Sequence, residues 1–283
     1  MKKLVLFITA IFSTYSSLTY AGWDQQLAKH HITANTIIFE QYEAYQAHHL
    51  PKIADPIIKA IPIHESGEAL VDIALERNPR IKMLPNPKTP FESPDANSGF
   101  SSASKIRTSV YNKLNQLVKA LDKIAPQFGF KAGQISIRVF EGLRDIETQN
   151  QLFNDKAKEI QLANPNFTPE EVIAETSKWV SPTLNNVPVH STGAAVDIRL
   201  YDESTQTLLE MGKFGVIWGK NESAQTFSNN ISDEIINNRL FLLVAAAEVG
   251  LINYPYEYWH FSAGDRYAAY WEHLKQAVYN KVE

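Results

Sequence analysis

The stretch His190-Ser-Thr-Gly193-Ala-Ala-Val-Asp197-Ile-Arg-Leu200 decides how the rest of the chain is interpreted. Gly193 breaks any helix, and the alternating pattern that follows predicts a strand over residues 194–200. The apolar side chains at 196, 198 and 200 would form its buried face, so Asp197 would point to the opposite face. A carboxylate in that position either has a function or faces solvent.

A second stretch, Glu257-Tyr-Trp-His260, supplies further side chains that suit a metal site. His190, Asp197 and His260 together offer two imidazoles and one carboxylate, all of which can bind zinc. Three protein ligands leave the fourth position of a tetrahedral zinc open for water, which is typical of catalytic rather than structural sites. The two stretches therefore predict one Zn²⁺ per chain and a metallohydrolase.

Two more residues have chemistry that suits this site. Glu257 would take the proton of the attacking water and pass it to the leaving amine. Arg144, at the end of a predicted strand, would stabilise the oxyanion of a tetrahedral intermediate, because a guanidinium stays charged and offers several donors. Each residue alone also has an ordinary structural explanation, but all of them together favour a peptidase.

The spacing of Glu257 and His260 sets a geometric condition. Residues three apart on a regular strand face opposite sides of the sheet, so both side chains could not reach one metal ion. We therefore expect a bulge or a turn between them.

The expected fold is α+β, with a small, mostly antiparallel central sheet flanked by helices and the zinc site on the sheet face. Helices are predicted over residues 105–127, 147–162, 232–247 and 267–279, and another opens at Thr168 with a capping box to Glu171. Strands are predicted over residues 134–140, 194–200 and 251–261.

The chain divides into three expected parts. Residues 1–21 have the basic start, short apolar run and small residues of a secretory signal peptide, and the run is too short to span a membrane. Residues 22–68 form an N-terminal extension, expected to be helical and packed on the catalytic part. Residues 69–283 form the zinc peptidase domain. We expect export across an inner membrane to a periplasmic or extracellular location, with no membrane insertion after cleavage.

Other candidate ligands are interpreted as structural. The stretch from His64 to Asp72 is similar to the stretch from His190 to Asp197, but one extra residue moves Asp72 to the other face of a strand. The pairs His30-His31 and His48-His49 are neighbours in sequence and point in different directions on a helix, which indicates surface residues. The Pro- and Ser-rich segment 85–104 is predicted to be a loop that lines the site or links the two parts.

The composition limits partners and stabilising devices. The formal net charge is −4, and loss of Lys2 and Lys3 with the signal peptide makes it −6, so neither nucleic acid nor an anionic membrane surface is an expected partner. The chain has no cysteine, which excludes disulfides. The sequence does not predict an oligomeric state.

The pattern His190-x-x-Gly193-x-Ala195-x-Asp197, followed by Asn253-Tyr-Pro-Tyr-Glu257-Tyr-Trp-His260-Phe, resembles the zinc D-alanyl-D-alanine dipeptidases of the VanX type. The resemblance extends from about Leu70 to the C-terminal helix. It implies the same zinc ligands, Glu257 as general base and Arg144 as the arginine that stabilises the transition state.

Three differences from that family bear on substrate specificity rather than on the metal ligands. Pro188 stands where the family has a serine, and Glu141-Gly-Leu-Arg144 stands where it commonly has Asp-Gly-Tyr-Arg. The usual Asn-Asn-Phe is replaced by a segment such as Lys88-Thr-Pro-Phe91.

The expected function is hydrolysis of D-alanyl-D-alanine, or of a closely related D,D-dipeptide, in peptidoglycan turnover or dipeptide salvage. One alternative keeps the site but changes the substrate, giving a D,D-carboxypeptidase or a peptidoglycan endopeptidase. A second alternative is a zinc-binding module without turnover, which the presence of Glu257 disfavours.

Overall fold

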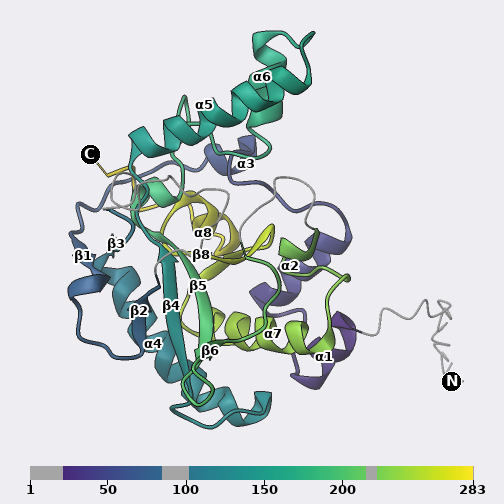
Figure 1. The fold of residues 1–283 in the computed structure, drawn as a ribbon, viewed down its shortest axis with the longest axis vertical. Coiled ribbons are helices and arrows are strands. Elements are labelled where there is room, and N and C mark those ends of the chain that lie inside the picture. Colours follow the sequence, from purple (N-terminus) through teal and green to yellow (C-terminus); the bar gives the residue numbers. More distant parts are fainter. Residues whose placement is uncertain (1–21, 85–101, 215–221, 283) are drawn as a thin grey trace, which may run out of the picture.

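The computed structural model describes residues 22–84, 102–214 and 222–282, which form an α+β fold (Figure 1). The helices are α1 (Trp23–Lys29), α2 (Ile37–Gln46), α3 (Pro56–Lys59), α4 (Thr108–Ile124), α5 (Ile146–Ala163), α6 (Pro169–Thr176), α7 (Asp233–Glu248) and α8 (Arg266–Trp271). The strands are β1 (Leu70–Asp72), β2 (Ile81–Met83), β3 (Lys105–Arg107), β4 (Ile135–Glu141), β5 (Ala195–Asp202), β6 (Thr207–Leu208), β7 (Ile252–Tyr254) and β8 (Glu257–Ser262). The expected signal peptide and nearly all of the 85–104 loop lie outside the described residues.

The central sheet has the strand order β2-β4-β5-β8-β7, and β6 also pairs with β5. Strands β2 and β4 are parallel, whereas the pairs that involve β5 and β8 are antiparallel. Strands β1 and β3 form a separate antiparallel pair. The prediction of a mostly antiparallel central sheet is confirmed.

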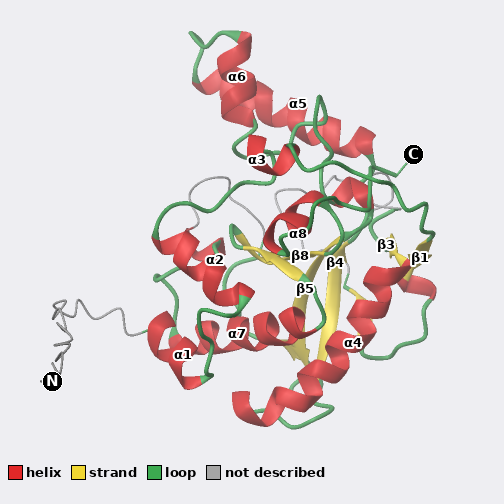
Figure 2. Ribbon diagram, turned by 180° about the vertical axis from the view of Figure 1, so that it is seen from behind, coloured by secondary structure: helices red, strands yellow, loops and turns green. Residues whose placement is uncertain are grey.

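Helices α4 and α7 cover one face of the central sheet (Figure 2). The apolar residues of β5 at positions 196, 198 and 200 are buried in this core, as their alternation predicted. Helix α4 buries its stripe of residues at three- and four-residue steps, including Leu114, Leu117 and Leu121. Helix α7 begins after Ser232, whose side chain accepts a hydrogen bond from the backbone N–H of Ile235. No helix of the described residues is both long and apolar enough to cross a membrane.

The opposite face of β5 is covered near its start by α8 and α3. Ala195 packs there with Ile58, Tyr267 and Trp271 in a second, smaller apolar cluster. Because side chains alternate along a strand, Asp197 shares this face with Ala195. The face that carries Asp197 is therefore the one on which a site can form.

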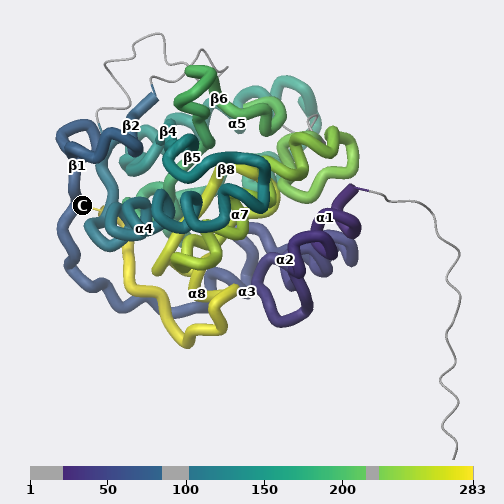
Figure 3. The backbone as a smooth tube through the Cα atoms, turned by 90° about the horizontal axis from the view of Figure 1, so that it is seen from below, coloured from purple at the N-terminus to yellow at the C-terminus, as the bar shows by residue number. Residues whose placement is uncertain are grey.

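The segment that contains α1, α2 and α3 packs against the rest of the protein (Figure 3). Helices α1 and α2 contact α7, and α3 contacts α8. Trp23 is buried in the main core, and its indole N–H donates to the carbonyl of Ser228 at 3.0 Å. Among the described residues, this segment contains the three helices α1, α2 and α3.

Helices α5 and α6 pack on each other and project from the main body (Figure 1). Asp145 caps α5 by accepting from the backbone N–H of Thr148. The capping box between Thr168 and Glu171 at the start of α6 is present as predicted. The first turn of α5 follows Arg144 directly, so the base of this projection is tied to the predicted site.

Two helix predictions were wrong at their ends. The helix predicted over 105–127 begins at Thr108, because residues 105–107 instead pair with β1 as strand β3, and it gives way after Ile124 to a 3-10 turn that contains Pro126. The helix predicted over 267–279 ends at Trp271. Past that point the backbone forms tertiary hydrogen bonds instead, with Ala277 and Val278 donating to the carbonyls of Pro62 and Gly264.

Candidate metal centre

His190 opens a single 3-10 turn that ends at Gly193 and leads directly into β5. Gly193 has φ +70°, and a Cβ atom there would lie 2.8 Å from Leu70 Cδ2, so only glycine fits the turn. The ring nitrogen Nδ1 of His190 lies 2.8 Å from the carbonyl oxygen of Gly142. Because a carbonyl only accepts, Nδ1 of the neutral ring carries the proton and Nε2 presents its lone pair.

Asp197 and His260 lie opposite each other on β5 and β8, and Glu141 lies opposite Asp197 on β4. Paired residues of neighbouring strands project from the same face of a sheet. His260 Nδ1 lies 3.2 Å from Asp197 Oδ1, and His190 Nε2 lies 3.3 Å from the same oxygen. The two ring nitrogens are 3.0 Å apart. The three atoms therefore form a compact triangle.

This triangle has the dimensions of a zinc site. Ligand atoms about 2.0 to 2.1 Å from a tetrahedral zinc ion lie about 3.3 to 3.4 Å from one another. His190, Asp197 and His260 are all buried. Among the described residues, these three form the group of histidine, cysteine and acidic side chains that lie close enough together to hold a metal ion. Asp197 Oδ1 is buried with no hydrogen-bond partner among the described residues, which is costly unless a cation offsets it. The donor set and its geometry fit zinc.

The electrostatics of the triangle favour an ionised carboxylate. Burial raises the pKa of Asp197, but the two histidines close to its carboxylate outweigh burial and hold that pKa well below its usual range. Burial lowers the pKa of His190, but the nearby charge of Asp197 raises it by a larger amount. The pKa of His190 therefore lies above its usual value. A bound divalent cation would displace the proton from such a histidine, since metal ligands must be deprotonated.

Glu257 stands at the start of β8, and its Oε2 atom lies 3.9 Å from His260 Nδ1. Its side chain is 29% exposed, so it borders the triangle on an accessible side. Burial raises the pKa of Glu257, and the nearby histidines and Arg144 offset this only in part. A carboxylate whose pKa is raised toward neutrality is suited to proton transfer.

The pairing of β7 with β8 contains the irregularity that the spacing of Glu257 and His260 predicted. Asn253 pairs with Phe261, but the next residue, Tyr254, pairs with Glu257. The three residues 258–260 of β8 are thus inserted opposite a single step of β7. This bulge allows side chains three positions apart to approach one another, which confirms the prediction.

Arg144 lies beside the triangle and is held by two neighbours. Its Nε and Nη2 donate to the two carboxylate oxygens of Glu141, both at 2.7 Å, and Nη1 donates to Oε1 of Gln149 at 3.0 Å. Burial lowers the pKa of Arg144, but the carboxylates of Glu141, Asp197 and Glu257 outweigh it and raise that pKa. Within the part of the chain that the structure describes, these bonds use three of its five N–H groups, which leaves two for a ligand.

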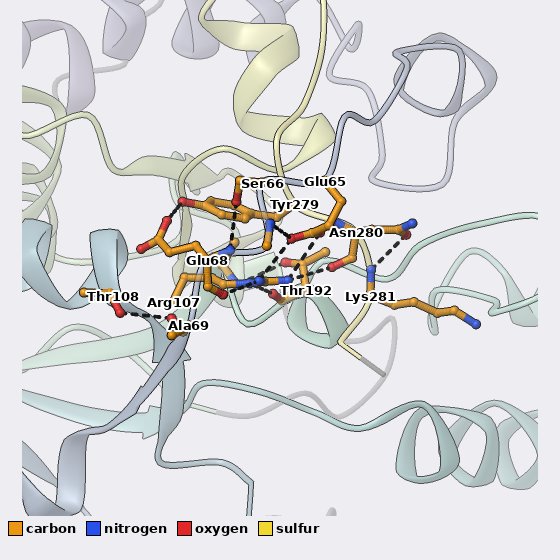
Figure 4. A network of polar contacts seen from close by, with 12 residues as sticks. Glu65, Ser66, Glu68, Ala69, Arg107, Thr108, Thr192, Tyr279, Asn280 and Lys281 are labelled. Atoms are coloured by element: carbon orange, nitrogen blue, oxygen red, sulfur yellow. Dashed lines mark hydrogen bonds and ion pairs between the residues drawn. The ribbon is translucent and has the colours of Figure 1, made fainter.

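Arg107 holds the turn that carries His190 in place through hydrogen bonds to its backbone (Figure 4). Only 5% of Arg107 is exposed; its Nε donates to the carbonyl of Thr192 at 2.8 Å, and its backbone N–H donates to the carbonyl of Gly193 at 2.8 Å. Its guanidinium lies over the ring of Tyr279 and bonds to the 65–68 segment, including Glu65. The C-terminal tail and the N-terminal extension are thereby joined to the turn that bears a potential ligand.

Comparison with known proteins identifies the family. Residues 115–279 match the family model Peptidase_M15, described as D-ala-D-ala dipeptidase. The chain belongs to this peptidase family. It is also 29% identical over 248 residues to a D-alanyl-D-alanine dipeptidase of Synechocystis sp., an alignment that covers 79% of this chain and 96% of that protein. The chain is therefore a metallopeptidase related to enzymes that act on D-Ala-D-Ala substrates.

Among solved structures, the LD-carboxypeptidase LdcB is 16% identical with a TM-score of 0.37, over 73% of this chain and 72% of that one. The vancomycin-resistance D,D-pentapeptidase VanY, in complex with Zn(II), is 19% identical with a TM-score of 0.32, over 63% of this chain and 84% of that one.

The structure of this peptidase brings together all five residues that the sequence singled out. The other candidate ligands lie elsewhere: His64 is exposed, and Asp72 caps a 3-10 turn by accepting from the backbone N–H of Ala74. Of the histidine pairs, His31, His48 and His49 are exposed, whereas His30 is half-buried and stacks on Phe128.

Sequence reasoning missed the residues that support the site. Glu141 stands three positions before Arg144, and a carboxylate at that distance from an arginine is a signal that could have suggested the ion pair. Arg107 carried no such signal, because its partners lie 39 to 173 positions away in the chain. In the sequence, Asn253 is only the first residue of the pattern that ends with Glu257 and His260. In the structure, its side chain bonds to the backbone of β8.

Proposed function

We propose that this protein hydrolyses D-alanyl-D-alanine, or a closely related D,D-dipeptide, at one zinc ion held by His190, Asp197 and His260. The observation that carries the proposal is the triangle of their ligand atoms, with edges of 3.0 to 3.3 Å and an orphaned carboxylate oxygen. Bound zinc would lower the pKa of a water molecule and polarise the substrate carbonyl.

The remaining chemistry falls to two side chains of the protein. Glu257 would accept a proton from the attacking water at a carboxylate oxygen and deliver it to the leaving amine, a role supported by its raised pKa and its position beside His260. Arg144 would direct its two remaining N–H groups at the oxyanion, while Glu141 and Gln149 keep its guanidinium oriented.

A dipeptide is favoured over a longer substrate by the family description and by the relative that the chain matches over 96% of that relative's length. The N-terminal extension also contacts the turn before Glu257, because the hydroxyl of Tyr256 donates to the carbonyl of Leu50 at 3.0 Å. We infer that this contact limits the space beside Glu257, which favours a short substrate.

The test uses residues 22–283 loaded with zinc and measures D-alanine release from D-Ala-D-Ala, with L-Ala-L-Ala as the control. We expect D-specific release that falls about 10²- to 10⁴-fold in the Glu257→Ala variant. Faster release from an acylated L-Lys-D-Ala-D-Ala peptide would instead establish a carboxypeptidase. Zinc binding without cleavage of either substrate would refute the assigned substrate class.

We also propose that residues 1–21 export the protein and that the mature chain begins at Gly22, in the periplasm or outside the cell. The support is the composition of this segment. Expression in a Gram-negative host, followed by fractionation and N-terminal sequencing, tests this. An uncleaved chain in the cytoplasm would contradict it.

A further inference from the structure

The bulge in β8 requires other groups of the protein to stabilise its conformation. Residues 258–260 are inserted opposite one step of β7, so the regular ladder between β7 and β8 is interrupted there. If the strand straightened by one residue, Glu257 or His260 would turn to the other face of the sheet. The approach of the predicted base to a predicted ligand therefore depends on the shape of this insertion.

The side-chain amide of Asn253 bonds to both ends of the insertion. Its Nδ2 donates to the carbonyl of Glu257 at 3.2 Å and to the carbonyl of His260 at 3.0 Å. An amide nitrogen has two hydrogens, so one side chain can satisfy both carbonyls at once. The distance between the backbones of the predicted base and the predicted ligand is thus set by one buried group.

Asn253 is itself held on two sides. Only 3% of it is exposed, and the hydroxyl of Thr226 donates to its Oδ1 atom at 2.7 Å. The side-chain amide of Gln41, in α2 of the N-terminal extension, donates to its backbone carbonyl at 2.9 Å. The Thr226 bond makes Oδ1 the acceptor and so directs Nδ2 toward β8, which fixes the orientation of the amide.

We propose that Asn253 is a positioning residue that holds the β8 bulge, so that Glu257 and His260 reach the same metal ion. This role rests on the proposed function of the site. Asparagine suits the position because it supplies two donors toward β8 and one acceptor toward Thr226. Aspartate has nearly the same shape but would place acceptor oxygens against two carbonyl oxygens.

The main test compares Asn253→Asp with a matched control, Asn238→Asp. Asn238 is also a buried asparagine whose side-chain amide donates to a backbone carbonyl, that of Glu210 at 2.9 Å, but it lies on α7 beneath the other face of the sheet. Both variants place a carboxylate in a buried site. A difference between them therefore reports the position of the group rather than a general loss of stability.

Three quantities are measured for each variant: kcat and KM for D-Ala-D-Ala, the zinc dissociation constant by competition with a chelator, and the thermal unfolding midpoint. In Asn253→Asp we expect kcat to fall about 100-fold with little change in KM, because a shift of about 1 Å in catalytic geometry has that effect. We expect zinc affinity to fall about 10-fold, as for other groups that orient a metal ligand. Asn238→Asp should change the unfolding midpoint alone.

Thr226 provides a second, milder pair of variants. Thr226→Val removes the hydroxyl that orients the amide and should shift kcat and zinc affinity in the same direction, whereas Thr226→Ser keeps the donor and should restore both. The proposal is overturned if Asn253→Asp and Asn238→Asp lose zinc affinity equally, or if Asn253→Asp keeps normal kcat and zinc affinity while folded. If the unmodified protein binds zinc without cleaving D-Ala-D-Ala, the substrate assignment fails, but the zinc affinities still decide the role of Asn253.

Discussion

Glu141 and Arg144 are joined by two hydrogen bonds of 2.7 Å, and Glu141 also lies directly opposite Asp197 in the sheet. This pair links the strand that carries a potential metal ligand to the arginine that precedes α5. A bidentate bond to a carboxylate fixes the plane of a guanidinium, so the free N–H groups of Arg144 keep one direction. The orientation of Arg144 therefore comes from the sheet, through Glu141, and is completed by Gln149 of α5.

Loss of this pair is expected to lower turnover. In Glu141→Gln the side chain offers one acceptor oxygen in place of two, so Arg144 is less well oriented. In Arg144→Lys the planar guanidinium, with its paired N–H donors, is absent altogether. We expect kcat for D-Ala-D-Ala to fall about 10²- to 10³-fold in Arg144→Lys, as for removal of an oxyanion donor, and less in Glu141→Gln. Steady-state kinetics checks both variants.

The control for this prediction is Glu203→Gln, which alters the pair of Glu203 and Arg138 at 3.0 Å, away from the triangle. Normal turnover in that variant would show that loss of an arginine–glutamate pair is not harmful in itself. Normal turnover in Arg144→Lys would exclude the assigned role of the guanidinium.

Much of the fold and site could be predicted, because local patterns determine them. The alternation of β5 placed Asp197 on the face opposite the core, and the three-residue spacing of Glu257 and His260 required the bulge that is present. The end of α8 at Trp271 could not be predicted in this way. Residues 277–278 bond to Pro62 and Gly264, and such distant partners leave no periodic signal in the sequence. The same holds for Arg107 and its contacts.

Zinc should stabilise the folded protein through the triangle. Binding only to the folded state raises stability by about 2.7 kcal/mol when free zinc is 100 times its dissociation constant. We expect a chelator to lower the unfolding midpoint and added zinc to restore it. The shift should disappear in His260→Ala, measured by differential scanning fluorimetry.

His64→Ala is the matched control for the zinc-dependent shift. This histidine is exposed, and its bond to Ala277 uses its backbone N–H, so removal of the ring leaves the local structure in place. The zinc-dependent shift should persist at full size. Its loss in His64→Ala would mean that zinc binds at a different place.

Arg107 should contribute strongly to stability. Its side chain bonds to the carbonyls of Glu68 and Thr192, and its guanidinium lies 4.9 Å from the centre of the Tyr279 ring. Arg107→Ala would leave two partly buried carbonyls without these bonds and should cost about 3 kcal/mol in the free energy of unfolding. Urea denaturation measures this.

Lys123→Ala is the comparison for Arg107→Ala, because Lys123 forms an exposed ion pair with Glu248 at 2.7 Å. Exposed pairs contribute about 0 to 1 kcal/mol, so its loss should be smaller. Equal losses in the two variants would contradict the view that Arg107 is a central anchor of the turn that carries His190.

The N-terminal extension should be inseparable from the catalytic part. Trp23, Leu27 and Tyr42 are buried in the same apolar core as α4 and α7, and Gln41 bonds to the backbone of Asn253. Removal of residues 22–68 would expose the surface of α7 that these side chains cover, and truncation of one large core side chain alone costs about 3 to 5 kcal/mol. Most domains are only about 5 to 15 kcal/mol more stable than their unfolded state.

We therefore expect a chain of residues 69–283 to be unfolded in circular dichroism. In the full-length mature protein, we expect Trp23→Ala to lower the free energy of unfolding while the protein still unfolds in a single cooperative transition. A folded, zinc-binding 69–283 fragment would instead establish the extension as a separate unit.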